Sequence, residues 1–107
     1  GSAPHKTLYL SGQTSFNGTA FVGNDMGAQL AASIENVDQS LKMAGMTKCD
    51  IVKIFVFVTS TDDVLAEWEQ YDTWLADCSL KPANTLVGIQ SLFDPDALIE
   101  IDVTAIH

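Results

Sequence analysis

Apolar residues recur along this chain with two periods, and the longer period predicts helices. Between residues 25 and 44 they recur at spacings of three and four, which places them on one side of a helix. The residues of this stripe are Met26, Leu30, Ile34, Val37, Leu41 and Ala44. Asn24 or Asp25 can cap the start, and Gly45 follows the last stripe residue as a left-handed C-terminal cap would. A helix is therefore predicted over Asp25–Ala44.

A second helix is predicted over Asp62–Ala76. Its apolar stripe consists of Val64, Trp68, Tyr71 and Leu75. Ser60 or Thr61 can cap its start, and Asp62 and Asp63 favour the positive end of the helix dipole.

The shorter period, with alternating or continuous apolar residues, is typical of β-strands. The predicted strands are Thr7–Gly12, Ile51–Val58, Thr85–Leu92 and Leu98–Ile106. A short strand at Ala20–Val22 is expected to pair with the first across an Asn17-Gly18 turn. The resulting order, β-β-α-β-α-β-β, predicts a two-layer α/β fold in which a mixed sheet carries both helices on one face.

Alternation along the strands divides the predicted sheet into two faces. The face under the helices is expected to be apolar throughout: Leu8, Leu10, Val52, Ile54, Val56, Val58, Val87, Ile89, Ile99, Ile101, Val103 and Ala105. The opposite face combines the carboxylates Glu100 and Asp102 with Phe55, Phe57 and Leu86. Such an apolar surface is unusual for a monomer, so we expect self-association to bury this face or its rim.

Charge excludes several classes of partner. The 107 residues carry a formal net charge of −9, from 14 acidic and 5 basic residues. Nucleic-acid binding requires clustered Lys and Arg, and anionic membranes repel an acidic protein, so neither partner is expected. No apolar run approaches the roughly 20 residues of a membrane span.

Length and cysteine use point to one small intracellular domain, expected to span residues 1–107 and to lie in the cytoplasm. Gly1-Ser2 is typical of the remnant of a cleaved tag. Cys49 and Cys78 sit in no CxxC pair, and we expect them to be reduced thiols. No His/Cys/Asp cluster has the spacing of metal ligands, so no metal is expected.

Short motifs in a fixed order run from Leu8 to Ile106. They are Ser11-Gly12-Gln13, Asp25 with Gln29, Glu35-Asn36-Val37, Ala44-Gly45, Asp50-Ile51-Val52-Lys53, Tyr71, Pro82-Ala83 and Glu100-Ile101-Asp102. Together they resemble the RidA (YjgF) family of reactive-intermediate deaminases. The resemblance implies a chorismate-mutase-like fold, a homotrimer, no cofactor, and a small-molecule site in each cleft between subunits. Active members hydrolyse enamines and imines released by pyridoxal-phosphate enzymes.

The resemblance also assigns site residues. The family arginine that clamps the substrate carboxylate corresponds to Asn84, and the glutamate that positions water corresponds to Glu100. Ser11 matches the serine of Ser-Gly-Gln, Leu86 a position that is often cysteine, and Trp68 a position that is usually asparagine. We expect all of these except Trp68 to lie on the face of the sheet away from the helices.

The loss of the arginine changes the expected ligand. Arginine binds a carboxylate through two charge-assisted hydrogen bonds, whereas asparagine offers a neutral amide. A site with Asn84 beside Glu100 should therefore repel 2-imino acids, and a neutral or cationic ligand suits it better. We expect the usual deaminase activity to be weak or absent.

Several alternatives stay open. Glu100 can orient water or form part of a solvated strand face, Asn84 can contact a ligand or form a turn, and Trp68 can stack on a ligand or pack in the core. The chain can accordingly be a divergent hydrolase or deaminase, a non-catalytic trimer that binds a small metabolite, or a scaffold for another enzyme. The sequence alone does not decide whether it is an enzyme.

Overall fold

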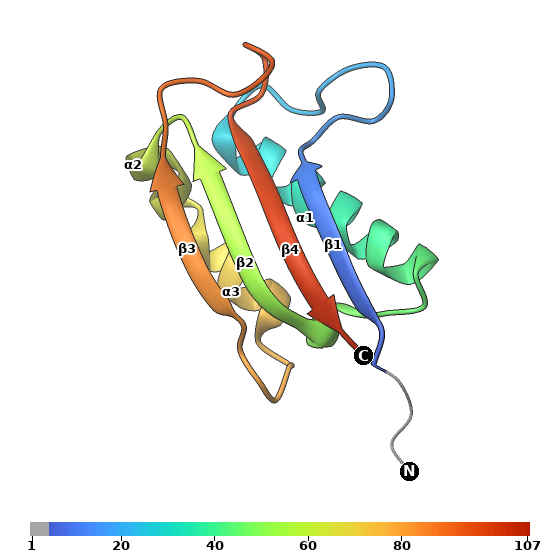
Figure 1. Ribbon diagram of the computed structural model, residues 1–107. Coiled ribbons are helices and arrows are strands. Elements are labelled where there is room, and N and C mark those ends of the chain that lie inside the picture. The colour runs from blue at the N-terminus through green and yellow to red at the C-terminus, as the bar shows by residue number, and fades with distance from the viewer. Residues whose placement is uncertain (1–4) are drawn as a thin grey trace.

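A computed structural model describes residues 5–107, so the tag assignment at Gly1-Ser2 lies outside the described residues. In chain order the elements are β1 (Thr7–Gln13), α1 (Met26–Met43), the 3₁₀ helix η1 (Lys48–Asp50), β2 (Ile51–Val58), α2 (Thr61–Ala66), α3 (Trp68–Leu75), β3 (Ala83–Gly88) and β4 (Ile99–Ile106). Figure 1 shows one sheet in front and the helices behind it, covering a single face.

The sheet is mixed and four-stranded, with strand order β1-β4-β2-β3. β2 and β3 are parallel, whereas β4 is antiparallel to both β1 and β2. β3 is therefore an edge strand that follows a helical crossover, as parallel pairing requires. The predicted two-layer α/β class is confirmed.

The predicted strand at Ala20–Val22 does not pair with β1. Only an isolated bridge between Phe16 and Phe21 forms there, closed by a turn in which Asn17 N donates to Ala20 O at 3.0 Å. A hydrogen bond holds this segment against α1 rather than β1, because the Asn36 amide donates to the backbone carbonyl of Phe16 at 3.0 Å. The segment thus forms a small hairpin of its own at the end of the sheet.

The first helix agrees closely with the prediction. Asp25 caps it by accepting a hydrogen bond from Ala28 N at 2.8 Å. Gly45 follows the C-cap with a φ of +73°, a conformation that glycine adopts without steric cost. The apolar stripe faces the core, with Leu30, Val37 and Leu41 fully buried.

The second predicted helix is divided into α2 and α3 at Glu67. Ser60 is its N-cap and accepts a hydrogen bond from Asp63 N. The Glu67 carboxyl group lies against Gly27 of α1, where a Cβ atom would come within 2.7 Å of Glu67 Cδ. Gln70 donates to both the Glu67 carboxylate and the Gly27 carbonyl, so the break is fixed by contacts with α1.

The core lies between the sheet and the helices, and alternation predicts it well for β2 and β4. Val52 is the exception, since it is exposed while Ile51 is buried. The cause is an irregularity in the β2–β4 register between Ile51 and Lys53, which reverses the alternation at the start of β2.

The prediction is wrong for β3, whose faces are reversed. Asn84 pairs with Ile54 and Leu86 with Val56, so both lie on the side of the sheet that the helices cover. Thr85 and Val87 take the open side instead. Both Leu86 and Val87 are apolar, so the sequence pattern of this strand does not distinguish its two faces.

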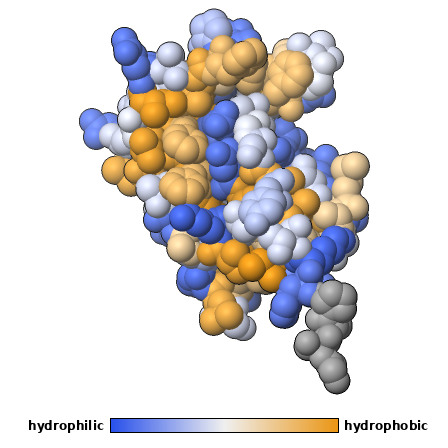
Figure 2. Space-filling view, viewed as in Figure 1, coloured by the Kyte–Doolittle hydropathy of each residue, from blue (hydrophilic) through white to orange (hydrophobic). Residues whose placement is uncertain are grey.

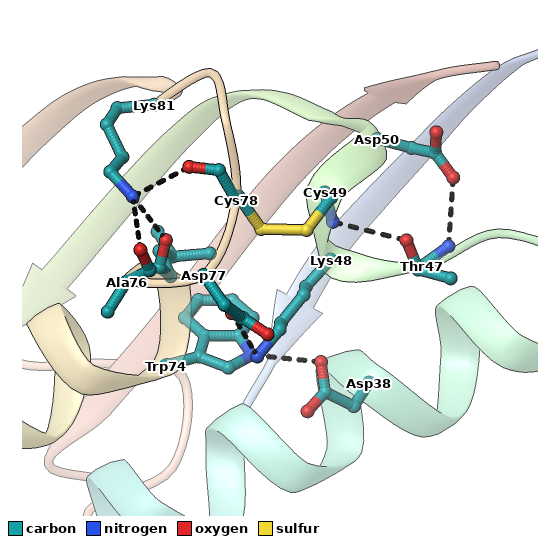
Figure 3. The surroundings of a disulfide bond; sticks show 11 residues. Asp38, Thr47, Lys48, Cys49, Asp50, Trp74, Ala76, Asp77, Cys78 and Lys81 are labelled. Atoms are coloured by element: carbon teal, nitrogen blue, oxygen red, sulfur yellow. Dashed lines mark hydrogen bonds and ion pairs between the residues drawn. A yellow bond between two sulfur atoms is a disulfide. The ribbon is translucent and has the colours of Figure 1, made fainter.

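The cysteines are not reduced thiols, because Cys49 and Cys78 form a disulfide. It joins η1 to the segment after α3, and an ion pair between Lys48 and Asp77 at 3.0 Å lies beside it (Figure 3). The two cysteines are 29 positions apart in the sequence, but their Cα atoms lie only 5.2 Å apart. Cys49, Cys78 and Asp77 also form a cluster of possible metal ligands, but the disulfide occupies both sulfur atoms.

None of the helices within residues 5–107 has both the length and the apolar character needed to cross a membrane.

Candidate functional site

Glu100 lies on the open face of the sheet, next to an irregular part of β1. It pairs with Phe57 across the β2–β4 ladder and is half-buried. The register of β1 shifts between Leu10 and Gln13, and in this interval Gly12 has a φ of +69°. A Cβ atom at position 12 would lie 3.9 Å from Glu100 Oε1, an ordinary van der Waals distance. Gly12 is therefore a direct neighbour of the glutamate carboxylate.

Electrostatics keep Glu100 protonated to a higher pH than an ordinary glutamate. Partial burial is the larger cause of its raised pKa, and the negative charge of Asp102 is the second. Asp102 itself accepts a hydrogen bond from Gly12 N at 2.8 Å, which holds the Ser11-Gly12 backbone in place. Among the described residues no donor binds the Glu100 carboxylate. It can therefore accept a proton from water or from a ligand.

A cavity of about 540 Å³ opens in front of Glu100. The hairpin after β1 contributes Phe16 and Phe21, and the loop before β4 contributes Leu92 and Phe93. Figure 1 shows both loops at the same end of the sheet, and Figure 2 shows hydrophobic surface gathered at that end and over the β2–β3 side. Ser11 is exposed and does not line this cavity, although its neighbour Gly12 does.

Gln29 joins the two loops that form this cavity. Its side chain is 2% exposed, and its Nε2 donates to Gly23 O at 3.2 Å and to Asp96 O at 2.8 Å. Its Oε1 accepts from Leu98 N at 2.9 Å, so all three polar contacts are to loop backbone. Gln29 had no predicted role of its own. The feature that could have revealed its role is its position, because an amide side chain directly before Leu30 lies on the buried side of the helix.

Asn84 lies in a different cavity, on the other side of the sheet. This groove, of about 480 Å³, runs between α3 and the edge strand and is lined by Tyr71, Lys81 and Asn84, among others. Asn84 is exposed, and its side-chain amide forms no hydrogen bond within residues 5–107. The amide is thus free for a ligand or a neighbouring chain, and the alternative role as a hydrogen-bonded turn residue is not observed.

Trp68 and Leu86 are packed rather than open to a ligand. Both are partly buried against the core, and the Trp68 ring stacks on Tyr71 with 4.3 Å between centroids. The Tyr71 hydroxyl is buried without a hydrogen-bond partner, and burial, followed by the charge of Asp72, raises its pKa to about 12. Tyr71 was predicted as part of an apolar helix stripe and of the family motifs, and not as a site residue. An aromatic stripe gives no sign that one hydroxyl would be unpaired beside a groove.

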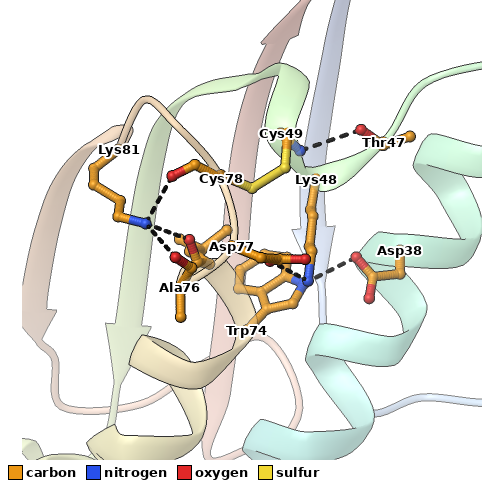
Figure 4. A network of polar contacts seen from close by, with 10 residues as sticks. Asp38, Thr47, Lys48, Cys49, Trp74, Ala76, Asp77, Cys78 and Lys81 are labelled. Carbon is orange, nitrogen blue, oxygen red and sulfur yellow. Dashed lines mark hydrogen bonds and ion pairs between the residues drawn. A yellow bond between two sulfur atoms is a disulfide. The ribbon is translucent and has the colours of Figure 1, made fainter.

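Lys81 does not replace the missing arginine. Its ammonium group donates to the carbonyls of Leu75, Ala76 and Cys78, at 2.6, 3.1 and 2.9 Å (Figure 4). Three acceptors occupy the three protons of the ammonium group. The lysine thus caps the end of α3 beside the disulfide. All five basic residues of the chain are lysines, so no arginine elsewhere can take over the role.

A family model described as Endoribonuclease L-PSP matches residues 2–107. Proteins named as members of the RutC, Rid and YjgF families match over nearly the whole chain. The chain belongs to the RidA/YjgF family. The 2-iminobutanoate/2-iminopropanoate deaminase of Escherichia coli is 33% identical over 102 residues, covering 94% of this chain and 79% of the relative. A RutC family protein of Aquifex aeolicus is 31% identical over 100 residues, covering 92% and 79%.

Solved structures of RidA/YjgF proteins share the fold. The Rid protein YyfB of Yersinia pestis superposes with a TM-score of 0.85 at 32% identity, covering 94% of this chain and 77% of that one. The yjgF gene product of E. coli superposes with a TM-score of 0.84 at 31% identity, covering 94% and 80%.

In this RidA/YjgF chain the assigned site residues form two separate groups. The first combines Glu100 with Gly12 and the adjacent Ser11 on the open face. The second combines Asn84 with Tyr71 on the helix side of the edge strand, and Leu86 lies on the same side. A single subunit therefore does not bring Asn84 and Glu100 together.

Proposed function

We propose that this chain is a hydrolase or deaminase of a small imine-, enamine- or amide-like metabolite, with its water held by Glu100. The observation that carries the proposal is a half-buried, unpaired carboxylate with a raised pKa, facing a cavity of about 540 Å³. A carboxyl group with a raised pKa suits a general base that also returns the proton. The similarity to proteins named deaminases supports this class of reaction.

The chemistry needs only water and one proton carrier. The oxygen of water adds to the carbon of the C=N bond of the protonated imine while Glu100 accepts a proton from that water, which gives a neutral carbinolamine. The proton on Glu100 then passes to the nitrogen, the C–N bond breaks, and the hydroxyl proton passes to solvent water as the carbonyl group forms. The products are a carbonyl compound and ammonia, with no change in oxidation state. An enamine enters the same route after it tautomerises to the imine.

The standard 2-imino acids are expected to be poor substrates. Asn84 supplies no positive charge, and the nearby Lys81 is occupied by three carbonyls. A substrate carboxylate beside the Glu100 carboxylate would then be uncompensated, which is costly in a partly buried site.

A complete site requires a second copy of the chain. Asn84 and Glu100 lie on opposite faces of one sheet, but Asn84 is on the edge strand, where another subunit can approach. The open face presents Tyr9, Phe55 and Phe57, which a neighbour would cover. We therefore propose inter-subunit clefts, and the family resemblance suggests a homotrimer. A mass of one or two chains in solution would contradict this assembly.

The cytoplasmic location is a prediction from the sequence, and the Cys49–Cys78 disulfide argues against it. Disulfides rarely persist in the cytosol, where thiol reductants are maintained. Thiol labelling of the protein in intact cells would decide the question, because two labelled cysteines would agree with the cytosol and none with an oxidising compartment.

The catalytic role is tested by ammonia release from imines generated in situ, with purified protein and its Glu100→Gln variant. We expect the variant to lose at least 100-fold in rate, the usual lower range for removing a general base. Glu35→Gln, an exposed carboxylate on α1, is the matched control. Equal rates for the wild type and Glu100→Gln would reject the role of Glu100.

The Asn84→Arg variant tests the proposed preference. It should gain activity on 2-iminopropanoate, because the guanidinium group restores a bidentate partner for the carboxylate. If no imine is turned over but small metabolites raise the melting temperature, the chain is the non-catalytic binding trimer instead. A ligand at 100 times its Kd adds about 2.7 kcal/mol to the unfolding free energy, which a thermal shift detects.

A further inference from the structure

We propose that the Glu100 cavity binds substrates in which an aryl or similarly bulky apolar group is attached to an uncharged or cationic nitrogen centre, with no carboxylate. The inference rests on the proposed function and names the substrate class of the same site. It depends on three features of the cavity: its aromatic wall, the hydrogen bonds that hold that wall, and the sign of its charges.

The apolar wall consists of three phenylalanines from two loops. Phe16 and Phe21 face each other across the small hairpin, with ring centroids 5.2 Å apart and planes inclined by 55°. Phe93, from the loop before β4, is fully exposed in the subunit. An aromatic ring that water surrounds completely gives no packing energy to the fold. Its place at the rim of the cavity leaves the whole ring available to a ligand.

The loop that carries Phe16 and Phe21 is fixed by side-chain amides. Asn17 Oδ1 accepts from Thr19 N and Ala20 N, both at 2.9 Å, and closes the turn. Asn36 Nδ2 donates to the carbonyls of Thr14 and Phe16 at 2.8 and 3.0 Å. A wall held in this way loses little conformational freedom when a ligand binds, which favours affinity.

The second loop is fixed in the same manner. Asp94 Oδ1 accepts from Asp96 N at 2.8 Å, and Ala97 N donates to Asp94 O at 3.0 Å. Gln29 binds the loop again at Asp96 and Leu98. Both sides of the cavity are thus built before a ligand arrives.

The charges of the cavity are all negative. Glu100 and Asp94 line it, and no lysine does within the described part of the chain. A cation, or a nitrogen that becomes positive as it takes up a proton, is therefore favoured over an anion. Aromatic faces add to this preference, because their quadrupoles attract cations. An imine that becomes an iminium ion beside an aryl group satisfies both conditions.

The size of the cavity agrees with a substrate larger than a three-carbon imine. Its volume of about 540 Å³ falls inside the range of roughly 300–1,000 Å³ for small-molecule sites. Imines of the proposed kind form when a flavin enzyme oxidises a primary aryl-alkyl amine. The amine gives two electrons and two protons to the flavin, and O₂ then takes them as hydrogen peroxide. This class of reaction is the expected source of the substrate.

The experiment compares binding of three probes to the purified full chain by calorimetry. They are 2-phenylethylamine, which has an aryl group and a cation, propylamine, which lacks the ring, and phenylacetate, which is an anion. We expect 2-phenylethylamine to bind about tenfold more tightly than either of the others. Phe93→Ala should weaken its binding about fivefold, the value of a favourable aromatic contact, and should not change propylamine binding. Phe16→Ala should act in the same direction.

Leu80→Ala is the matched control, because Leu80 is an exposed apolar residue (81%) between α3 and β3, away from this cavity. It should leave the binding of all three probes unchanged. Turnover is followed in parallel as ammonia release from 2-phenylethylamine oxidised by a flavin amine oxidase.

The outcomes separate this inference from the proposed function. Tight, Phe93-dependent binding of 2-phenylethylamine without turnover would support the pocket assignment and reject the chemistry. Turnover of small imines without selective binding of the aryl amine would support the chemistry and overturn the pocket assignment. Equal binding of the three probes, or binding that Phe93→Ala leaves unchanged, would also overturn it.

Discussion

The two groups of site residues differ in how the fold supports them. The Asn84 group is held by a disulfide and by the three hydrogen bonds of Lys81, at the end of a helix. The Glu100 group is formed by a strand and two loops, which the single amide of Gln29 connects. The region with the covalent brace thus carries the neutral Asn84. The region that is braced by hydrogen bonds alone carries the Glu100 carboxylate and an aromatic wall. Support and candidate chemistry lie in different parts of the subunit.

The largest effect is expected from reducing the disulfide, which would remove the difference in support between the two regions. For a loop closed across 29 residues, chain entropy predicts a loss of roughly 3–4 kcal/mol in unfolding free energy. Urea unfolding with and without a phosphine reductant measures it, and Cys49→Ser/Cys78→Ser should reproduce it. Hydrogen exchange should rise around residues 78–84 and not in the two loops near Glu100. Equal unfolding midpoints would show that the disulfide does not brace this region.

Gln29→Ala would test the weaker support of the Glu100 group. It leaves a buried backbone N–H and two carbonyls without partners, which costs about 2 kcal/mol. It should also lower ammonia release, since the loop that carries Phe93 loses its tie. Urea unfolding and the imine assay provide the two measurements. Gln39→Ala, at an exposed position of the same helix, should change neither.

Tyr71→Phe is expected to stabilise the Asn84 group. The Tyr71 hydroxyl is buried without a partner, so its removal should raise the unfolding free energy by about 1 kcal/mol. Tyr9→Phe, at a hydroxyl that water can reach, is the control and should have no effect. If Tyr71→Phe weakens assembly instead, measured by sedimentation, a second copy of the chain supplies the partner.

The smallest effect concerns the charge of Glu100 and depends on pH. Burial and the charge of Asp102 raise the folded-state pKa of Glu100 above its ordinary value, so the ionised form opposes folding. The Glu100→Gln variant should therefore melt slightly higher than the wild type at pH 7. Below pH 4.5 both folded and unfolded wild type are protonated at this position, and the difference should vanish. A constant difference across this range would indicate a packing effect rather than a charge effect.

The sequence predicts the layers of this fold better than the contacts between them. The α1 stripe and the alternation in β4 lead directly to buried faces, because burial there follows one period. The faces of β3 could not be predicted, since Leu86 and Val87 are equally apolar and the register comes from β2. The break at Glu67 depends on contacts with another helix, which no local pattern records.

For the candidate site, the family motifs identified the residues, and the structure showed that they form two separate groups. Glu100 lies where alternation placed it, on the open face beside Gly12. Asn84 does not lie on the face that alternation predicted. It can meet Glu100 only across two chains, and this changes how asparagine at this position is interpreted. The disulfide was missed because the distance between η1 and the end of α3 is set by tertiary packing.

The position of β3 at the edge of the sheet has a practical consequence. Its outer backbone groups are unpaired within the described sheet, and the aromatic open face lies next to them. An unprotected edge beside apolar surface is a template for non-native pairing between chains. If assembly covers both features, dilution would dissociate the protein and expose them. Heated samples should then precipitate more readily when dilute than when concentrated, the reverse of ordinary colloidal behaviour.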